Sequence, residues 1–259
     1  MGRISMRLFS HHGKFLVHLL VFSLALWESR SGLGSSFEVS PIRVTFQANE
    51  STTLMTVRND GQERLRLQVS VMGWDQNRQG EMVLAPTDDI IFYPNLLTIE
   101  PGAQRNLRLG ANNVAVSKEQ TYRIFVEELP SNQKFQTTGV RVVTKMSIPI
   151  FIKPAKADVR NSIDRIALQG SDFSFDVTNR GNVHIQPREV RVKGTGADGR
   201  VQLEKKIPGW YILAGGSREY RVELPKAECT RIKDLTVEVD LEDKSFTQNF
   251  AVPAGACPR

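Results

Sequence analysis

A succession of short β-strand patterns, each closed by turn residues, limits what this chain of 259 residues can fold into. From Phe37 onward, apolar and polar residues alternate over short segments, and no segment carries a convincing helical stripe. Turn sequences such as NDGQ, from residue 59, and EPGA, from residue 100, separate the segments. The patterned segments up to residue 129 are 43–47, 52–59, 64–74, 81–85, 96–102, 104–111 and 122–129. This spacing is typical of an immunoglobulin-type β-sandwich, so the chain is predicted to be all-β.

The same rhythm starts again after the segment KPAKAD (153–158), and the strands predicted there include the segment YILAGG (211–216). Two of the strand patterns resemble each other, because LMTVRNDG (54–61) and FSFDVTNRGN (173–182) both alternate and then end in an Asn-containing turn. We therefore predict two tandem immunoglobulin-like β-sandwiches, residues 37–154 and 155–259. Pro154 stiffens the joint, which has no long Gly/Ser tract, so a fixed angle and a cleft between the two sandwiches are expected.

The first 36 residues have the outline of a secretory signal peptide, since Arg3, Arg7 and Lys14 precede the apolar run FLVHLLVFSLALW (15–27). This run is shorter than the roughly 20 residues that a membrane span needs, and no second such run follows. The mature chain is therefore expected to begin near residues 35–37 and to have no membrane-inserted segment. An uncleaved membrane anchor is the alternative.

The expected mature chain, without residues 1–36, has a nearly balanced charge and only two cysteines. Its formal charge falls from +6 to +3, because 30 basic and 27 acidic residues remain. So mild a balance gives little support for a nucleic-acid partner, and none is expected. Cys229 and Cys257 are the only cysteines, and in an exported chain they are expected to form one disulfide.

Enzyme chemistry has little support in the sequence. Three of the four histidines lie in the signal segment, which leaves His184 alone in a turn that precedes a strand pattern. No nucleophile elbow accompanies it, and no Gly-rich phosphate loop follows a strand and opens a helix. We therefore expect a protein that is not an enzyme, that has neither cofactor nor metal, and that acts by recognising another protein.

The segment VRVVTKMSIPIFIKP (140–154) reads as one unusually long strand. Alternate residues from Val140 to Ile152 share one face, and all of them except Thr144 are apolar. This stretch would span about 43 Å at about 3.3 Å per residue, against roughly 17–20 Å for an ordinary strand. Pro149 cannot donate to a sheet ladder, which indicates an edge strand. A long apolar edge is a template for pairing with another chain.

Four segments in this order resemble the periplasmic chaperones of chaperone–usher pilus assembly: SPIRVTF (40–46), LTIEPGAQRNLRL (97–109), SKEQTYRIFVEELP (117–130) and TKMSIPIFIKP (144–154). The resemblance is close over the first sandwich, whereas in the second only the strand pattern agrees. It implies a periplasmic chaperone that binds pilus or fimbrial subunits by donor-strand complementation and delivers them to an outer-membrane usher. A strand of such a chaperone fills the open groove of an incomplete subunit sandwich.

The resemblance also implies which residues bind the subunit. The residues expected to form the donor surface are Val140, Val142, Thr144 and Met146, with Thr144 in register between its apolar neighbours. The residues expected to fill the chaperone's own core are Ile148, Ile150 and Ile152.

Arg43 matches the cleft arginine that, in the best-known members of the family, binds the C-terminal carboxylate of the subunit. A guanidinium suits this task because it can hold a carboxylate through two parallel hydrogen bonds. Pro149 stands where those members have a partner lysine, so Lys145 or Lys153 is expected to substitute. Phe125 replaces a family asparagine. Both departures indicate a non-classical branch whose anchoring differs.

Two other interpretations remain open on the sequence. An exported two-domain structural or adhesive module without chaperone activity would cap strand 140–147 within its own fold, and the apolar face would then be ordinary core. A secreted pair of receptor-like sandwiches would use NES (49–51) as a glycosylation site. The absence of a Cys…Trp…Cys pattern argues against the second interpretation.

Overall fold

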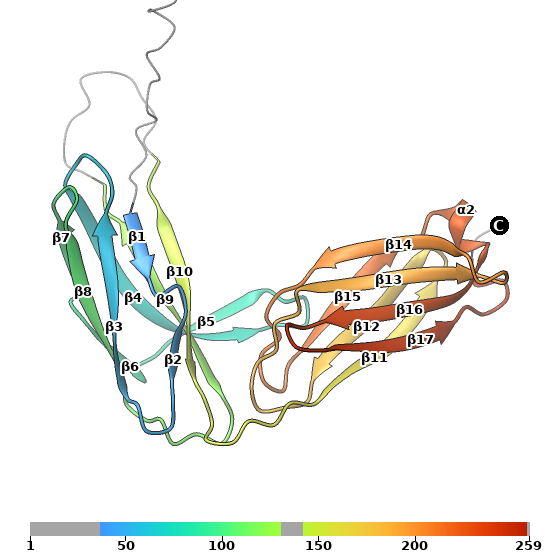
Figure 1. The fold of residues 1–259 in the computed structure, drawn as a ribbon, viewed down its shortest axis with the longest axis horizontal. Coiled ribbons are helices and arrows are strands. Elements are labelled where there is room, and N and C mark those ends of the chain that lie inside the picture. Colours follow the sequence, from blue (N-terminus) through green and yellow to red (C-terminus); the bar gives the residue numbers. More distant parts are fainter. Residues whose placement is uncertain (1–36, 131–141, 258–259) are drawn as a thin grey trace, which may run out of the picture.

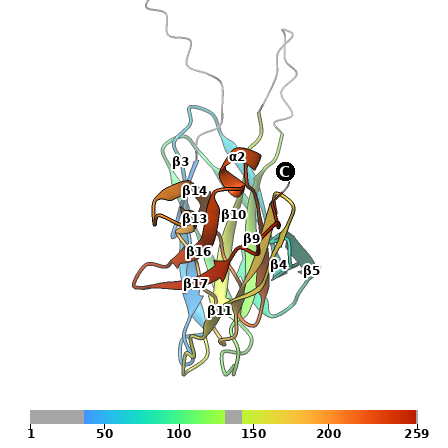
Figure 2. The same cartoon turned by 90° about the vertical axis from the view of Figure 1, so that its right-hand side faces the viewer.

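The computed structural model describes residues 37–130 and 142–257, which fold into two β-sandwiches. Figure 1 shows the two sandwiches joined at one end and set at an angle, and Figure 2 shows the same arrangement turned by 90°. The predicted all-β class with two tandem immunoglobulin-like sandwiches is confirmed. The signal peptide predicted for residues 1–36 lies outside the described residues.

Two sheets form the first sandwich. In strand order, one contains β1 (Phe37–Ser40), β3 (Thr52–Asn59), β8 (Gln104–Ala111) and β6 (Ile90–Tyr93). In strand order, the other contains β2 (Val44–Phe46), β10 (Lys145–Ile152), β9 (Gln120–Glu128), β4 (Leu65–Gln76) and β5 (Met82–Pro86), with β7 (Leu96–Ile99) also paired to β4. Alternate residues of each strand point between the sheets, which is why a period of two identified most of them. The largest fully buried side chains there include Phe46, Met55, Leu67, Ile124 and Ile150.

The second sandwich has one sheet of β11 (Asn161–Gln169), β12 (Asp172–Asn179) and β15 (Ser217–Glu223). The facing sheet has the strand order β14 (Val201–Pro208), β13 (Glu189–Gly196), β16 (Ile232–Asp240) and β17 (Ser245–Ala251). A short helix, α2 (Lys226–Cys229), connects β15 to β16. Phe173 and Phe175 of β12 are fully buried between these sheets, with their rings 5.5 Å apart.

The two similar segments, 54–61 and 173–182, form the same asparagine-closed turn, once in each sandwich. Asn59 ends β3 and Asn179 ends β12, and both side chains are buried. Each side-chain oxygen accepts a hydrogen bond from the amide of the glycine two residues later, at 2.9 and 3.0 Å. Each side-chain nitrogen donates to the carbonyl four residues later, at 2.8 Å in both cases. A buried asparagine therefore closes the same turn in each sandwich by satisfying its backbone groups.

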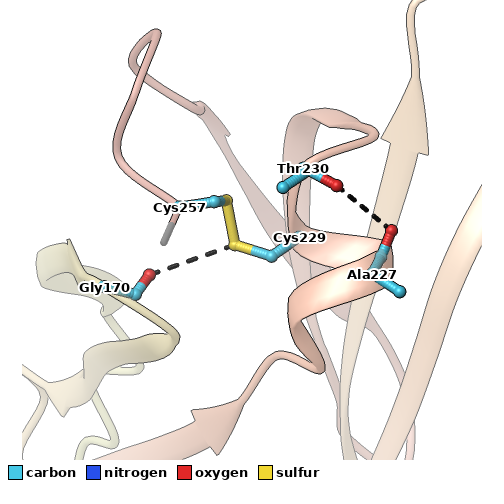
Figure 3. The surroundings of a disulfide bond; sticks show 5 residues. All are labelled: Gly170, Ala227, Cys229, Thr230 and Cys257. Carbon is cyan, nitrogen blue, oxygen red and sulfur yellow. Dashed lines mark hydrogen bonds between the residues drawn. A yellow bond between two sulfur atoms is a disulfide. The ribbon is translucent and has the colours of Figure 1, made fainter. Parts of the chain in front are cut away.

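The two cysteines expected to pair are joined in a disulfide, Cys229–Cys257, which ties the C-terminal segment to α2 (Figure 3). The carbonyl oxygen of Gly170 lies 4.0 Å from the Cys229 sulfur. This is a packing contact, because a disulfide sulfur has no hydrogen to donate. Thr230 Oγ1 donates to the carbonyl of Ala227 at 3.2 Å and closes the end of α2.

Strand prediction failed at three places for identifiable reasons. β1 and β6 were not predicted, because each is only four residues long and the IIFY run of β6 does not alternate. The segment YILAGG (211–216) was predicted as a strand, but only Ile212 pairs there, in an isolated bridge with Ile185. Its apolar side chains serve two different interiors: Ile212 lies in the core of the second sandwich, whereas Tyr211 and Leu213 pack in the joint.

An apolar cluster fills the joint between the sandwiches. Trp74 of β4 and Phe151 of β10 pack there against Tyr211 and Leu213 of the second sandwich, and all four are buried. The ring centroids of Trp74 and Tyr211 are 5.5 Å apart, in an edge-to-face arrangement that aromatic pairs favour.

Polar contacts flank this cluster. Arg78, in the β4–β5 turn, donates from Nη2 to Asp176 Oδ1 (2.8 Å) and from Nε to Asp176 Oδ2 (2.9 Å). His184 Nδ1 lies 2.6 Å from Glu119 Oε1, and its ring stacks on Phe151 at 4.0 Å. These contacts are consistent with the fixed angle that the sequence predicts.

Candidate functional site

Strand β10 is paired on both sides over only part of its length. All of its residues, Lys145–Ile152, pair with β9 in antiparallel register. On the other side, only Ile150, Phe151 and Ile152 pair, in parallel register, with Val44–Phe46 of β2. Within the described residues, no strand pairs with the segment 145–149 on that side. Figure 1 shows this part of β10 extending away from the joint, and we call it the free edge.

The free edge explains how a proline is tolerated in this strand. Glu128 N donates to the Thr144 carbonyl (2.9 Å), whereas Lys153 N donates to Phe46 of β2 (3.0 Å). Because backbone groups of successive residues point to opposite sides of a strand, even-numbered residues face β9 and odd-numbered residues face β2 or the free edge. The nitrogen of Pro149 therefore points away from β9, and its missing N–H removes no hydrogen bond from the β9–β10 ladder.

The side chains on this face become more exposed from Ile152 back toward Val142. Ile148, Ile150 and Ile152 are buried in the first core, as predicted. Met146 is partly buried and packs against the same core, and Thr144 is half-buried. Val142 is 63% exposed, and its neighbour Val143 is 48% exposed. Val140 lies outside the described residues.

The regular strand is shorter than the predicted range 140–152. β10 begins at Lys145, and residues 142–144 precede it without belonging to it. The Thr144 amide donates to the side-chain Oε2 of Glu128 at 3.3 Å. In a continuing ladder the Thr144 amide would donate to a backbone carbonyl of β9. Here it donates to the Glu128 side chain, which explains why the regular pairing stops at this point.

A cleft of about 790 Å³ lies between the two sandwiches, next to the end of β10 that is nearer the joint. Arg43, at the start of β2, and Lys153, at the end of β10, line it together with residues of the second sandwich that include Gln186, Arg188 and Trp210. Arg43 Nη2 donates to Gln186 Oε1 (2.7 Å) and to the Tyr211 hydroxyl (2.8 Å). Among the described residues, neither Arg43 nor Lys153 has a carboxylate within ion-pair distance.

The structure brings two of the three predicted anchor residues together and separates the third. Arg43 and Lys153 share the cleft. Lys145 does not line it: its Nζ lies 2.8 Å from Glu127 Oε2 and 5.1 Å from the centre of the Phe125 ring, on the outer face of the sheet. Of the three predicted anchor residues, only Arg43 and Lys153 are therefore placed to meet a carboxylate in the cleft.

Arg123 is a cation that the sequence reasoning missed. It lies on β9 directly opposite Pro149 and is only 4% exposed. Its guanidinium stacks over Trp74, 3.9 Å from the ring centre, with Trp210 and Tyr211 each 5.9 Å away. Its Nε and Nη2 have no hydrogen-bond partner, and Nη1 makes one long contact of 3.5 Å with the Ser147 carbonyl. Burial lowers the pKa of this guanidinium.

A buried guanidinium without an acid partner is unfavourable unless a ligand supplies one. Arg123 faces the same side of the sheet as the joint cluster, and its contact with Ser147 places it next to the free edge. The sequence held one signal for it, a charge in the middle of the otherwise apolar run YRIFV (122–126). What that pattern could not reveal was the lack of a partner.

His184 takes a structural place in the joint, in contact with Glu119 and Phe151. No group of three or more side chains that could hold a metal ion occurs in residues 37–130 and 142–257. In the same part of the chain, none of the helices has the length and apolar character required to span a bilayer.

Comparisons with known proteins agree with this geometry. Residues 36–158 match the family model described as the pili and flagellar-assembly chaperone, PapD N-terminal domain. No curated protein matches the sequence.

Several solved structures share the fold. The class 5 fimbriae chaperone CfaA has a TM-score of 0.57 and 16% identity, over 84% of this chain and 100% of that chain. The complex of CsuC and the tip subunit CsuE, from archaic chaperone-usher Csu pili of Acinetobacter baumannii, contains a match with a TM-score of 0.55 and 20% identity, over 83% of this chain and 97% of that chain. The E. coli chaperone DraB has a TM-score of 0.54 and 18% identity, over 83% and 98%.

Proposed function

We propose that this chain, whose first sandwich belongs to the PapD-type pili and flagellar-assembly chaperones, binds pilus subunits in the periplasm by lending them the free edge of β10 and delivers them to an outer-membrane usher. Such chaperones assist folding and assembly without catalysing a reaction, in agreement with the prediction that this protein is not an enzyme. The observation that carries the proposal is a strand whose one end is buried in its own core while its other end offers unpaired backbone and exposed valines.

The free edge suits strand addition because it offers both unpaired backbone groups and an exposed apolar side chain. Unpaired backbone groups along 145–149 can form ladder hydrogen bonds with a subunit strand. Val142, which is exposed here, can enter an open apolar groove, and each buried aliphatic side chain contributes about 1.5–3 kcal/mol. The proposed donor surface remains Val140, Val142, Thr144 and Met146.

Cations at the base of the free edge supply the proposed anchor for the C-terminal carboxylate of the subunit. Arg43 and Lys153 line the cleft, and Lys145 stays a weaker candidate because it already pairs with Glu127. We add Arg123, whose two unpartnered nitrogens can donate two parallel hydrogen bonds to a carboxylate. It stands opposite Pro149, so β9 would supply the cation that β10 lacks at this position.

Localisation follows from the proposed export. Residues 1–36 would direct the chain to the periplasm, leaving the proposed sandwiches 37–154 and 155–259. The oxidising environment there would sustain the Cys229–Cys257 disulfide.

Co-expression with neighbouring subunit genes, followed by co-purification, tests the proposal. Val142→Asp should reduce subunit recovery at least tenfold, because a carboxylate would have to enter the apolar groove. Leu54→Asp is the matched control: Leu54 is 51% exposed on the other sheet of the same sandwich, and its replacement should leave recovery unchanged. Circular dichroism should show both variants folded. Normal recovery with Val142→Asp would contradict strand donation and favour an exported structural module.

A further inference from the structure

At the opposite edge of the same sheet lies β5, a second strand with one side that pairs with no other strand among the described residues. β5 is the last strand in the order β2-β10-β9-β4-β5 and pairs only with β4. All five of its residues are exposed, including Met82 (47%), Val83 (50%) and Leu84 (39%). Because successive residues of a strand point to opposite faces, both faces of β5 are open. Figure 2 shows β5 at the flank of the molecule, beyond β4.

The edge strands β14 and β17 of the second sandwich are protected against pairing, and β5 is not. β14 carries Lys205 and Lys206, and the exposed residues 247–249 of β17 are Thr, Gln and Asn. Charged or polar side chains on an edge strand discourage pairing with another chain. The sequence of β5, MVLAP, has no charged residue, and its only such feature is the terminal Pro86.

Acidic residues surround this apolar edge. Asp75 lies opposite Val83 on β4, Glu81 precedes the strand and Asp88 follows it. Asp75 accepts a hydrogen bond from the Gln76 amide, and Glu81 accepts one from Asn77 Nδ2 at 2.7 Å. Throughout the described residues, none of these three carboxylates has a lysine or arginine within ion-pair distance. The edge therefore carries three carboxylates without an ion-pair partner in the described part of the chain, and the Arg218 guanidinium lies beside Gly80 in the preceding turn.

The second sandwich holds the β4–β5 hairpin in place. Arg78 in its turn binds the fully buried Asp176 through two nitrogens, and Glu219 N donates to the Arg78 carbonyl at 2.8 Å. Gln76 Oε1 accepts from the Leu213 amide at 3.3 Å. A hairpin fixed at its tip loses little conformational freedom when a partner binds, which favours binding.

We propose that the edge of β5 binds an extended polypeptide segment of alternating apolar and basic residues, which adds to the sheet as a further strand. The backbone of β5 supplies the ladder, Met82 and Leu84 contact apolar side chains on one face, and Asp75, Glu81 and Asp88 pair with basic ones. A second copy of β5 fits poorly, because pairing two such edges would bring these carboxylates together. This surface is distinct from the free edge of β10 and does not depend on the function proposed for it.

A synthetic ten-residue peptide of alternating valine and lysine tests the proposal by fluorescence anisotropy with the purified chain. It should bind, and the double variant Met82→Ser/Leu84→Ser should weaken binding at least tenfold. The variant Glu81→Gln/Asp88→Asn should weaken it about fivefold and reduce its dependence on salt. A peptide of alternating valine and glutamate should not bind.

Two controls separate β5 from the other exposed apolar residues. Leu54→Ser and Val142→Ser should leave binding of the valine–lysine peptide unchanged. Equal binding of the acidic peptide, or unchanged binding by Met82→Ser/Leu84→Ser, would overturn the proposal. Loss of binding with Val142→Ser would also overturn it, because the peptide would then occupy β10.

Discussion

Replacing Arg123 by methionine should stabilise the free protein while removing part of its proposed subunit-binding site. Methionine has a similar length and a flexible, apolar side chain, so it can occupy the same space against Trp74. The change removes a buried charge that has no acid partner among the described residues.

The expected size of the effect follows from the contacts of the guanidinium. Two buried donors, Nε and Nη2, lack partners, and each such group costs about 1–3 kcal/mol. Against this, the cation–π contact with Trp74 at 3.9 Å is worth about 2 kcal/mol in a desolvated site. The difference predicts that Arg123→Met raises the free energy of unfolding by roughly 0–4 kcal/mol, with a central value of about 2 kcal/mol.

Urea unfolding of the free protein measures this change, and co-purification of co-expressed subunits measures binding. The expected result is a higher urea midpoint together with at least a tenfold loss of subunit recovery. Arg123→Lys, which keeps a charge but cannot hold a carboxylate through two parallel bonds, should recover part of the binding. Arg108→Met is the matched control, since Arg108 is exposed on β8 and should change stability by less than about 0.5 kcal/mol.

Opposite results would refute this reasoning. A loss of more than about 1 kcal/mol would mean that Arg123 stabilises the joint and is not held ready for a ligand. Normal subunit recovery by a folded Arg123→Met protein would remove Arg123 from the anchor.

Three further predictions concern stability. Replacing both Cys229 and Cys257 by serine should lower the free energy of unfolding by about 3.6 kcal/mol on the chain-entropy model, because the bond closes a loop with a sequence separation of 28; urea unfolding should show this loss, with subunit recovery unchanged. Asp176→Asn should destabilise the protein by about 2 kcal/mol in thermal unfolding and broaden the distribution of inter-sandwich angles in small-angle scattering, since a fully buried carboxylate there binds arginines of both sandwiches. Burial, and after it the hydrogen bond to Asp89, raises the pKa of the Tyr122 phenol. The stabilisation that the neutral phenol provides is therefore complete below pH about 10, and it falls at higher pH because the phenol ionises first in the unfolded chain. Tyr122→Phe should reduce this alkaline loss, measured as the urea midpoint between pH 8 and 11.

Much of the fold could be read from local patterns. β3 and β8 were predicted at their observed limits, because long alternating strands buried on one face carry the same signal along their whole length. The short strands β1 and β6 gave too few residues for a period to be recognised. The end of β10 at Lys145 depends on a hydrogen bond between Thr144 and the side chain of Glu128, residues sixteen positions apart, which no local pattern contains.

Some residues of the candidate site were identified from the sequence, and others only from the structure. Arg43 and Lys153 were identified from short motifs, and the cleft brings them together. Lys145 was an equal candidate on the sequence, and only the observed contact with Glu127 sets it apart. Arg123 passed unnoticed because the significance of a buried cation depends on what surrounds it.

By itself, the sequence determined the strand content, the number of sandwiches, the pairing of the only two cysteines and the unusual apolar length of the segment at 140–154. These properties follow from the order of residue types along the chain, where a period of two and turn residues act locally. Only the tertiary structure decided where β10 loses its second neighbour, which cations share the cleft, and that Arg123 and the edge of β5 lack partners. Those properties depend on distances between residues that are far apart in the chain, and on which groups are left without a neighbour when the two sandwiches pack.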